Sequence, residues 1–164
     1  FQILIVIMFA YVVVYFFGQS RTNVGQSMDV TLSGGDTVLI NMMAYQLSGP
    51  ERGDIISFKP NGSESSHSNI KRVIGLPGET VQIIEGMIYI NDKVYLEQKN
   101  YPSITNPGMA SEPIKLDGDE YFVLGDNRNN SEDSRYANIG NIKKEHIIGK
   151  VWFRVAPWGD MGFL

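Results

Sequence analysis

The feature that most constrains this chain is its apolar beginning, Phe1 to Phe17, which contains no charged residue. As a helix rising 1.5 Å per residue, such a run is at the short end of what crosses about 30 Å of hydrocarbon. The chain becomes polar directly afterwards, at Gln19, Ser20 and Arg21. We therefore predict a membrane anchor over residues 1–18, and we expect its apolar run to begin upstream of Phe1.

Two other interpretations of this segment are weaker. A cleaved signal peptide has a shorter apolar stretch that ends in small residues, whereas this run ends in Tyr15, Phe16 and Phe17. A buried core helix is disfavoured because the segment has no polar face. An uncleaved anchor places Ser27 close to a bilayer surface, since the ten residues after Phe17 reach at most about 33 Å.

The part of this 164-residue chain that follows the anchor has the length and pattern of one mostly β domain. Stretches rich in Val, Ile, Tyr and Phe alternate with clusters of Gly, Pro, Asn and Asp. Glu85-Gly86 and Asn91-Asp92 predict tight turns, and Lys143 to Ile147 predicts one helical turn. The predicted loops are Pro60 to Ser68 and Gln98 to Pro113. The predicted strands are Asp36–Asn41, Asp54–Phe58, Asn69–Ile74, Thr80–Ile84, Met87–Asn91, Glu120–Leu124 and Ile148–Val155.

Composition excludes several classes of function. A net charge of −4 and a pI near 5.1 argue against a nucleic-acid partner, which requires a basic surface. The absence of cysteine excludes disulfides, thiolate nucleophiles and zinc-thiolate sites. The two histidines, His67 and His146, are far apart and lack the spacing of metal ligands. We therefore predict no metal and no cofactor.

Lys71 is a candidate general base. A serine hydroxyl needs a base to act as a nucleophile, and a neutral lysine can replace histidine if burial lowers its pKa. Lys71 lies within the apolar strand Asn69–Ile74, where alternation sends Lys71 and Arg72 to opposite faces. This pattern allows Lys71 to point inward while Arg72 meets solvent or a carboxylate. An ordinary edge-strand lysine is the alternative.

A dense polar loop, Gly125 to Arg135, follows the apolar strand Tyr121 to Leu124. A calcium loop is disfavoured because Arg128 interrupts the alternating oxygen ligands. A solvated turn is the other simple interpretation. The alternation of Asp126, Arg128, Asp133 and Arg135 instead favours an internal ion-pair network, with Ser131 and Ser134 available to hydrogen-bond a neutral amine.

These residues occur in blocks that resemble the bacterial type I signal peptidases, or leader peptidases. These are membrane-anchored Ser-Lys proteases that remove signal peptides from exported proteins. The resemblance is collinear from Gly25 to about Pro157, and five blocks in the same order are far more specific than any one block. The blocks are Ser27 to Leu32, Gly35 to Asn41, Arg52 to Phe58, Lys71 to Glu79 and Gly125 to Arg135.

The resemblance implies Ser27 as the nucleophile, Lys71 as the general base and Ser131 as the residue that orients the Lys71 amine. It assigns Asp126, Arg128, Asp133 and Arg135 to structural support. An extended substrate is expected to add as a strand between Val24 to Gln26 and Asn69 to Ile70. Shallow pockets near Met28, Leu32 and Ile70 would admit small residues, although core packing is an equal alternative for these three.

The implied fold is mostly β. It is an antiparallel catalytic domain over residues 19–164, with a small β insertion at about 80–119 and one N-terminal transmembrane helix. The implied location is the bacterial cell membrane, single-pass, with the catalytic domain extracytoplasmic. The implied partners are secretory preproteins and the lipid bilayer, and a monomer is expected. The apolar tail Trp152 to Leu164 is consistent with a closing strand or with lipid contact.

Two residues beside Ser27 depart from the family pattern. Gly25 stands where many members have a serine that helps to hold the oxyanion. This side-chain donor is absent here, as it is in members that resemble the Gram-positive branch. Val30 stands where the family usually has proline, and we expect valine to adopt an extended conformation there. These departures keep open a catalytically weak scaffold or chaperone in surface-protein or pilus assembly. A self-cleaving Ser-Lys repressor is disfavoured because no DNA-binding module is present.

Overall fold

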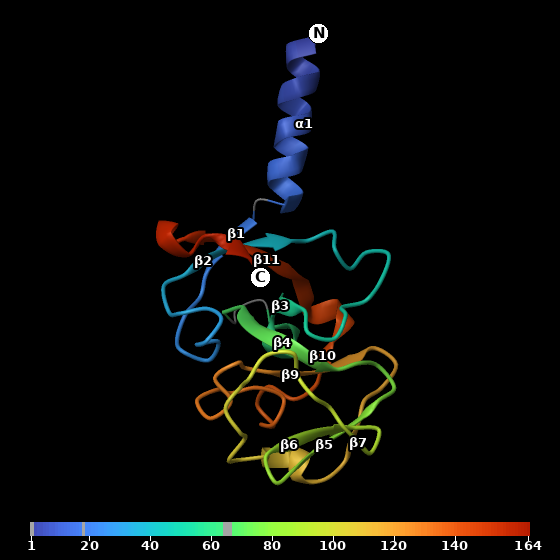
Figure 1. Ribbon diagram of the computed structural model, residues 1–164. Coiled ribbons are helices and arrows are strands. Elements are labelled where there is room, and N and C mark those ends of the chain that lie inside the picture. Colours follow the sequence, from blue (N-terminus) through green and yellow to red (C-terminus); the bar gives the residue numbers. More distant parts are fainter. Residues whose placement is uncertain (1, 18, 64–66) are drawn as a thin grey trace.

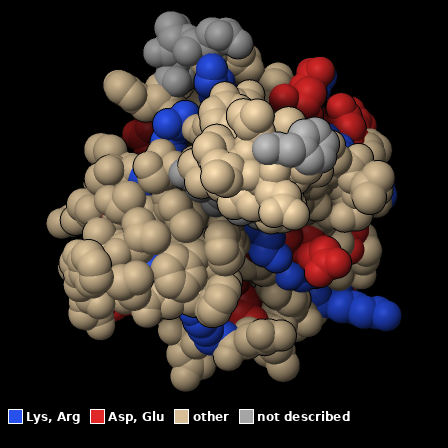
Figure 2. All heavy atoms as spheres, turned by 90° about the horizontal axis from the view of Figure 1, so that it is seen from above, with Lys and Arg blue, Asp and Glu red and all other residues tan. Residues whose placement is uncertain are grey.

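The computed structural model of the chain describes residues 2–17, 19–63 and 67–164. Helix α1 (Gln2–Phe17) projects from a β domain (Figure 1). Its uncharged side chains are largely exposed, and the view from the α1 end shows charged atoms only in scattered groups (Figure 2). No helix within the described residues combines the length and apolar character needed to cross a bilayer. Phe1 and Gly18 of the predicted anchor lie outside the described residues.

The main sheet of the β domain is antiparallel and follows the spatial order β1-β2-β11-β3-β4-β9-β10, with β12 added beside β11. The path β3-β4-β9 places Lys71 in the middle of the sheet rather than on an outer strand. The strands of this sheet are β1 (Gln19–Thr22), β2 (Thr37–Asn41), β3 (Ile55–Phe58), β4 (Asn69–Gly75), β9 (Glu120–Leu124), β10 (Ile142–Lys143), β11 (Ile147–Ala156) and β12 (Gly162–Phe163).

A second, four-stranded sheet lies at the end of the domain far from α1 (Figure 1). Two tight turns build it, and in both turns the two central residues have positive φ, as type I′ hairpins require. These turns are Glu85-Gly86 and Asn91-Asp92, as the sequence predicts. The strands, in spatial order, are β7 (Lys93–Val94), β6 (Met87–Ile90), β5 (Thr80–Ile84) and β8 (Ile114–Lys115).

Short 3-10 helices lie in the connections between strands: η1 (Pro60–Gly62), η2 (Gly108–Ser111), η3 (Lys144–His146) and η4 (Trp158–Asp160). η3 confirms the predicted helical turn. η1 and η2 lie within the two predicted loops, and residues 64–66 of the first loop lie outside the described residues.

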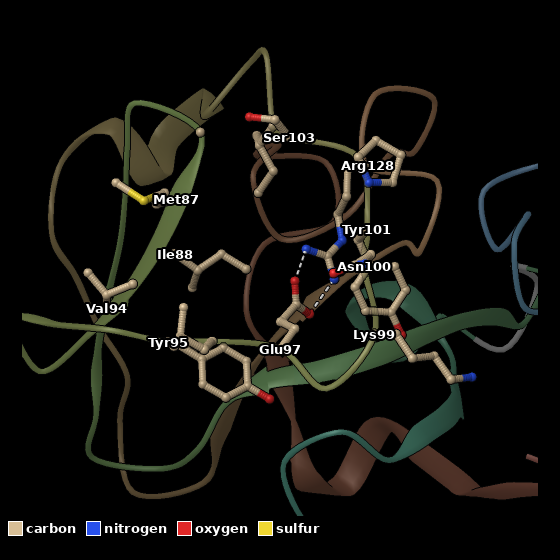
Figure 3. A pocket seen from close by; sticks show the side chains of 14 residues that line it. Met87, Ile88, Val94, Tyr95, Glu97, Lys99, Asn100, Tyr101, Ser103 and Arg128 are labelled. Carbon is tan, nitrogen blue, oxygen red and sulfur yellow. Dashed lines mark hydrogen bonds and ion pairs between the residues drawn. The ribbon is translucent and has the colours of Figure 1, made fainter.

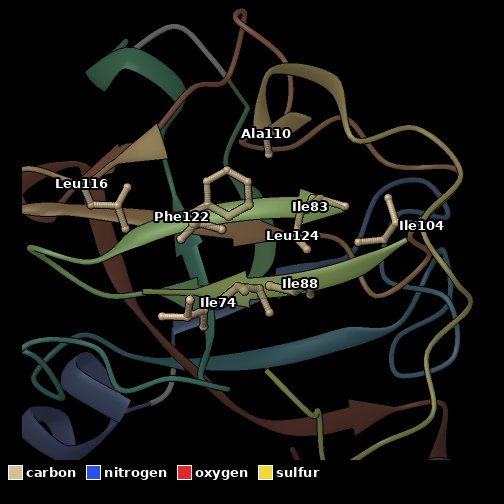
Figure 4. Packing of buried hydrophobic residues seen from close by; sticks show 10 residues of the cluster. Ile74, Ile83, Ile88, Ile104, Ala110, Leu116, Phe122 and Leu124 are labelled. Carbon is tan, nitrogen blue, oxygen red and sulfur yellow. The ribbon is translucent and has the colours of Figure 1, made fainter. Parts of the chain in front are cut away.

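Strand β4 packs against three separate hydrophobic clusters, because successive side chains leave it on alternate faces. Ile70 belongs to a cluster with Met28 and Leu32, and Val73 to another cluster. Ile74 joins the cluster between the two sheets (Figure 4). Burial of each such side chain contributes about 1.5–3 kcal/mol. The strand that carries Lys71 is therefore anchored along its whole length.

The predicted strands are confirmed as β2, β3, β4, β5, β6, β9 and β11, with ends that differ by at most one or two residues. The sequence analysis misses the short strands β1, β7, β8, β10 and β12. Most of these have only two residues, too few for a period of two to be recognisable. β1 is polar and exposed along most of its length, so only its pairing with β2 makes it a strand.

Gly86 provides a test of the hairpin between β5 and β6. Its φ is 79°, and an added Cβ would collide with Ser103 and approach the Ile104 carbonyl oxygen. We expect Gly86→Ala to lower the free energy of unfolding by about 1–2 kcal/mol, the usual cost of the left-handed conformation. Gly118→Ala is the matched control, because a Cβ there meets nothing within 4 Å. Chemical denaturation of both variants measures the difference, and equal stabilities would contradict the expectation.

Candidate active site

Ser27 lies in a compact loop between β1 and β2. Buried Asn23 closes the base of this loop, because its side-chain amide donates to the carbonyl oxygens of Leu32 and Ser33. Within the loop, the Asp29 and Thr31 amides donate to the Gln26 and Met28 carbonyl oxygens and form tight turns around Ser27. Met28 is fully buried beneath the loop. The backbone around the Ser27 hydroxyl is therefore well fixed.

Lys71 reaches Ser27 from strand β4. Its Nζ donates a hydrogen bond to Ser27 Oγ at 2.6 Å, which joins residues 44 positions apart in sequence. The Lys71 side chain points inward as predicted, and the residue is only 5% exposed. The neighbouring Arg72 leaves the opposite face of β4 and meets the Asp126 carboxylate. The alternation predicted for these two residues is confirmed.

Burial lowers the pKa of Lys71 from its ordinary value of 10.5 to about 8. The carboxylates of Asp133 and Glu132 act in the opposite direction, because they stabilise the charged ammonium. Desolvation is the larger effect, so a useful fraction of the amine is neutral in mildly alkaline solution. A serine hydroxyl bonded to such an amine is the arrangement of serine hydrolases that use lysine in place of histidine.

The polar loop after β9 approaches the Ser27–Lys71 pair at Gly125. An added Cβ on Gly125 would collide with the Ser131 side chain and with the Ser27 carbonyl oxygen, so only glycine fits there. The Asn127 amide also donates to the Ser27 carbonyl oxygen at 3.0 Å. The Ser131 hydroxyl is buried and has no hydrogen-bond partner among the described residues. Its predicted role toward the Lys71 amine stays a prediction.

Four charged residues of this loop, Asp126, Arg128, Asp133 and Arg135, are buried, but their network is internal only in part. Asp133 pairs with Arg135 at 2.8 Å within the loop, whereas Asp126 pairs with Arg72 from β4 at 2.7 Å. Thr31 Oγ1 also donates to Asp126. The sequence analysis misses Thr31 because its partner is far away in sequence. Ser134 binds the β9 backbone, since its hydroxyl accepts the Val123 amide, so it is not directed at an amine.

Arg128 pairs outside the loop with a residue that the sequence analysis misses. Glu97 receives two hydrogen bonds from its guanidinium (Figure 3). The Tyr101 ring lies 4.3 Å from the guanidinium carbon of Arg128. Arg128 Nε in turn donates to the Gly125 carbonyl oxygen at 3.0 Å. The segment between β7 and β8 thus holds the polar loop from outside, next to a hollow of about 310 Å³.

A cleft of about 230 Å³ opens beside the Ser27–Lys71 pair. Its walls come from the end of β1 and the residues before Ser27 on one side, and from the start of β4 on the other. Ile70 lines this cleft. Met28 and Leu32 are fully buried in the core and do not line it, so their contact with a substrate stays a prediction. Exposed His67 lies at the cleft, and His146 lies elsewhere, in η3.

One edge of β4 is unpaired beside this cleft. β3 pairs with Asn69 to Arg72, whereas β9 pairs only with residues from Arg72 onward. β9 ends at Leu124, and the chain then turns away at Gly125 into the polar loop. The β9-facing edge of residues 69–71 therefore carries no strand within the described part of the chain. Such an edge can accept an extended peptide by backbone hydrogen bonding.

The two departures from the family pattern have conformational explanations. Gly25 has a φ of 85°, in the left-handed region that glycine adopts without strain, so a serine there would be strained. Val30 has a φ of 89°, so the expectation that it is extended is wrong. The tight turns after Ser27 impose this conformation, which is a marked outlier for a β-branched residue.

Among the described residues, no group of three or more His, Asp or Glu side chains is arranged to hold a metal ion. Ser27 and Lys71 bring a hydroxyl, an amine and a backbone amide together in this site. Ser27, Lys71 and the approaching polar loop, on an antiparallel sheet, define a candidate serine peptidase site.

Comparisons with known proteins agree with this class. The model of the family described as signal peptidase, peptidase S26, matches residues 1–158. The probable signal peptidase I-2 of Synechocystis sp. is 38% identical over 153 residues, which cover 91% of this chain and 68% of that protein. Signal peptidase I T of Bacillus subtilis is 34% identical over 166 residues, covering 97% of this chain and 84% of that protein.

A solved structure is also similar. The crystal structure of a signal peptidase I from Enterococcus faecalis is 34% identical, with a TM-score of 0.50, over 62% of this chain and 96% of that one. The chain belongs to the signal peptidase S26 family and is an enzyme of the signal peptidase I type.

Val30 provides a test of backbone strain next to Ser27. We expect Val30→Gly to raise the free energy of unfolding by about 1 kcal/mol, because glycine avoids the left-handed penalty and the exposed Val30 side chain contributes little burial. The melting temperature should rise by about 2–4 °C. Val24→Gly is the control, since Val24 is also exposed but lacks a positive φ, and it should melt lower. A lower melting temperature for Val30→Gly would contradict the strain.

Proposed function

We propose that Ser27 and Lys71 are the catalytic dyad with which this peptidase cleaves signal peptides from secretory preproteins. The observation that carries the proposal is the 2.6 Å hydrogen bond from Lys71 Nζ to Ser27 Oγ. In the reactive state the Lys71 amine is neutral and accepts the Ser27 hydroxyl proton while Oγ attacks the scissile carbonyl carbon. This step forms a tetrahedral intermediate with a negatively charged oxygen.

The next steps return the enzyme to its starting state. The protonated Lys71 amine donates its proton to the departing amine, the peptide C–N bond breaks, and the signal peptide stays bound as an ester of Ser27. Lys71 then accepts a proton from a water molecule that attacks the ester. Collapse of the second intermediate releases the signal peptide carboxylate and returns the proton to Ser27 Oγ.

The Ser27 backbone amide is the proposed donor to the oxyanion. Within the described structure this N–H donates to no other group, so it is available for the developing charge. Gly25 supplies no side-chain donor. We also propose that Ser131 positions the Lys71 amine, because its buried hydroxyl lies next to Gly125 and has no other partner among the described residues. The buried ion pairs of Asp126, Arg128, Asp133 and Arg135 support this loop.

The substrate is proposed to bind as an extended strand on the unpaired edge of residues 69–71. Its backbone would pair with β4 on one side and with the segment from Val24 to Gln26 on the other. Ile70 lines the cleft, and Met28 and Leu32 pack behind it in the same hydrophobic cluster. One methylene more or less against an apolar side chain such as Ile70 changes binding by about 1–3 kcal/mol. The proposed preference at this contact is for small residues before the cut.

We propose that α1 anchors the enzyme in the bacterial cell membrane with the catalytic domain outside the cytoplasm. Residues 1–18 form the anchor and residues 19–164 the catalytic domain, with the region of about 80–119 as an insertion, and the enzyme acts as a monomer. Exposed apolar side chains along α1 support contact with lipid. The C-terminal segment adds Trp158 and Phe163, which are 88% and 80% exposed.

A non-catalytic scaffold explains the site less well. A scaffold has no need to bury a lysine at a serine hydroxyl, because burial of an ammonium group costs free energy. The glycine at position 25, which favoured a scaffold, is explained by its positive φ.

Removal of either dyad member tests the proposal. We expect Ser27→Ala and Lys71→Met to lower cleavage of a preprotein in detergent by about 10⁴-fold or more, because nucleophile and base act as a unit. Mass spectrometry of the wild-type product should locate the cut after a small residue. Lys115→Met is the control, since Lys115 is exposed in β8 and contacts only the small sheet region. Near-normal turnover of either dyad variant would refute the dyad.

The pKa of Lys71 predicts the pH dependence of cleavage. Because only the neutral amine accepts the Ser27 proton, kcat/KM should fall about tenfold per pH unit below pH 8 and level off above it. His67 also lines the cleft, and in the His67→Gln variant the position of the acidic limb should not change. Activity that peaks at low pH and falls above neutrality would contradict Lys71 as the base.

A further inference from the structure

A second hollow lies on the other side of Ser27. Its volume is about 600 Å³, and it shares Val24 and Ser27 with the cleft described above, so the two hollows flank the nucleophile. One wall is formed by Gln26, whose side chain accepts a hydrogen bond from Asn130. The opposite wall is formed by the polar loop and includes Ser131, Glu132 and Tyr136. A polypeptide that passes over Ser27 can therefore occupy both hollows.

The two hollows differ in charge. The cleft on the β1 side is lined by residues of the three basic types, Arg21, His67 and Lys71. Among the residues that the structure describes, the second hollow is lined by a single carboxylate, Glu132, and by no lysine, arginine or histidine. Glu132 is exposed, and its carboxylate accepts one hydrogen bond, from the side-chain amide of Asn138 at 3.1 Å. Among the described residues, no cation forms an ion pair with it.

The fold indicates which part of the substrate enters the second hollow. The cleft on the opposite side includes Arg21 and Thr22 of β1, which directly follows α1. If α1 lies in the bilayer, as the proposed function states, a signal peptide reaches Ser27 from the β1 side. The residues before the scissile bond then fill the cleft, and those after it fill the second hollow.

We propose that the second hollow is the subsite for the first residues of the mature protein and that Glu132 makes it favour a basic side chain there. A lysine or arginine after the cut finds a carboxylate without an ion-pair partner among the described residues, whereas a basic residue before the cut meets Arg21. Glu132 is a specificity residue in this role and takes no part in bond making. The inference rests on the proposed function, since it requires Ser27 to be the nucleophile.

The test uses a series of signal-peptide substrates that are identical up to the cut. The first, second and third residues after the cut are changed in turn to Lys, Gln or Glu. For the wild-type enzyme we expect kcat/KM for Lys over Gln to be about two- to fivefold at one or more of these positions, the factor that an exposed ion pair contributes. The ratio should fall to about one in Glu132→Gln and below one in Glu132→Lys.

The ratio of kcat/KM values for the Lys and Gln peptides does not depend on the effect that Glu132 has on the pKa of Lys71. Both peptides meet the same enzyme at the same pH, so any change in the pKa of Lys71 cancels. Glu112→Gln is the matched control, because Glu112 is exposed after η2 and lines neither hollow, and it should keep the wild-type ratio.

Two results would overturn the inference in different ways. Equal ratios in the wild type and Glu132→Gln, with the Gln peptide cleaved efficiently, would exclude Glu132 as a selector and leave the dyad intact. If the wild type cleaves no peptide of the series and no preprotein, the proposed function fails, and the subsite fails with it.

Discussion

The carboxylate of Asp126 is the contact on which the geometry of the site depends. It is fully buried and joins three segments: β4 through Arg72, the Ser27 loop through Thr31, and the polar loop to which it belongs. Removal of one partner of a buried ion pair leaves an uncompensated charge and typically costs about 3–5 kcal/mol. Because Arg72 follows Lys71 directly in β4, the Arg72–Asp126 ion pair also fixes the position of the strand that carries the Lys71 amine. The Ser27 loop, the strand of Lys71 and the polar loop are thus held together by one buried carboxylate.

The charge state of Lys71 depends on two opposing effects. Burial lowers its pKa, and the nearby carboxylates of Asp133 and Glu132 raise it. Arg135 offsets part of the rise that these carboxylates cause. It forms two hydrogen bonds with Asp133, and its own positive charge lowers the pKa of Lys71. The polar loop can therefore place acidic groups near the amine without keeping it fully protonated. The Glu97–Arg128 pair holds this loop at its outer side, which links the segment between β7 and β8 to the geometry around Ser27 and Lys71.

In the proposed function, the two hollows beside Ser27 recognise different parts of the substrate. One lies against an unpaired strand edge and an apolar residue, Ile70, and suits the extended, small-residue end of a signal peptide. The other is polar, with Glu132 as its charged group, and suits the start of the mature protein. Backbone pairing supplies affinity that is independent of sequence, whereas the side chains at the two ends supply selection. Under the proposed function, this division would allow one site to accept precursors of different sequence and still select the bond that is cut.

Much of this enzyme follows from the sequence alone. Alternating apolar residues determine the longer strands, Glu85-Gly86 and Asn91-Asp92 determine two hairpin turns, and the order of the motif blocks identifies Ser27 and Lys71 as partners. Tertiary structure decides what local patterns do not encode. Arg128 finds Glu97, Asp126 finds Arg72 and Thr31, and Val30 adopts a positive φ. Sequence periodicity reports which face of a strand a residue occupies, whereas an ion pair or a forced turn depends on which distant segment packs against it. That packing exists only once the chain has folded.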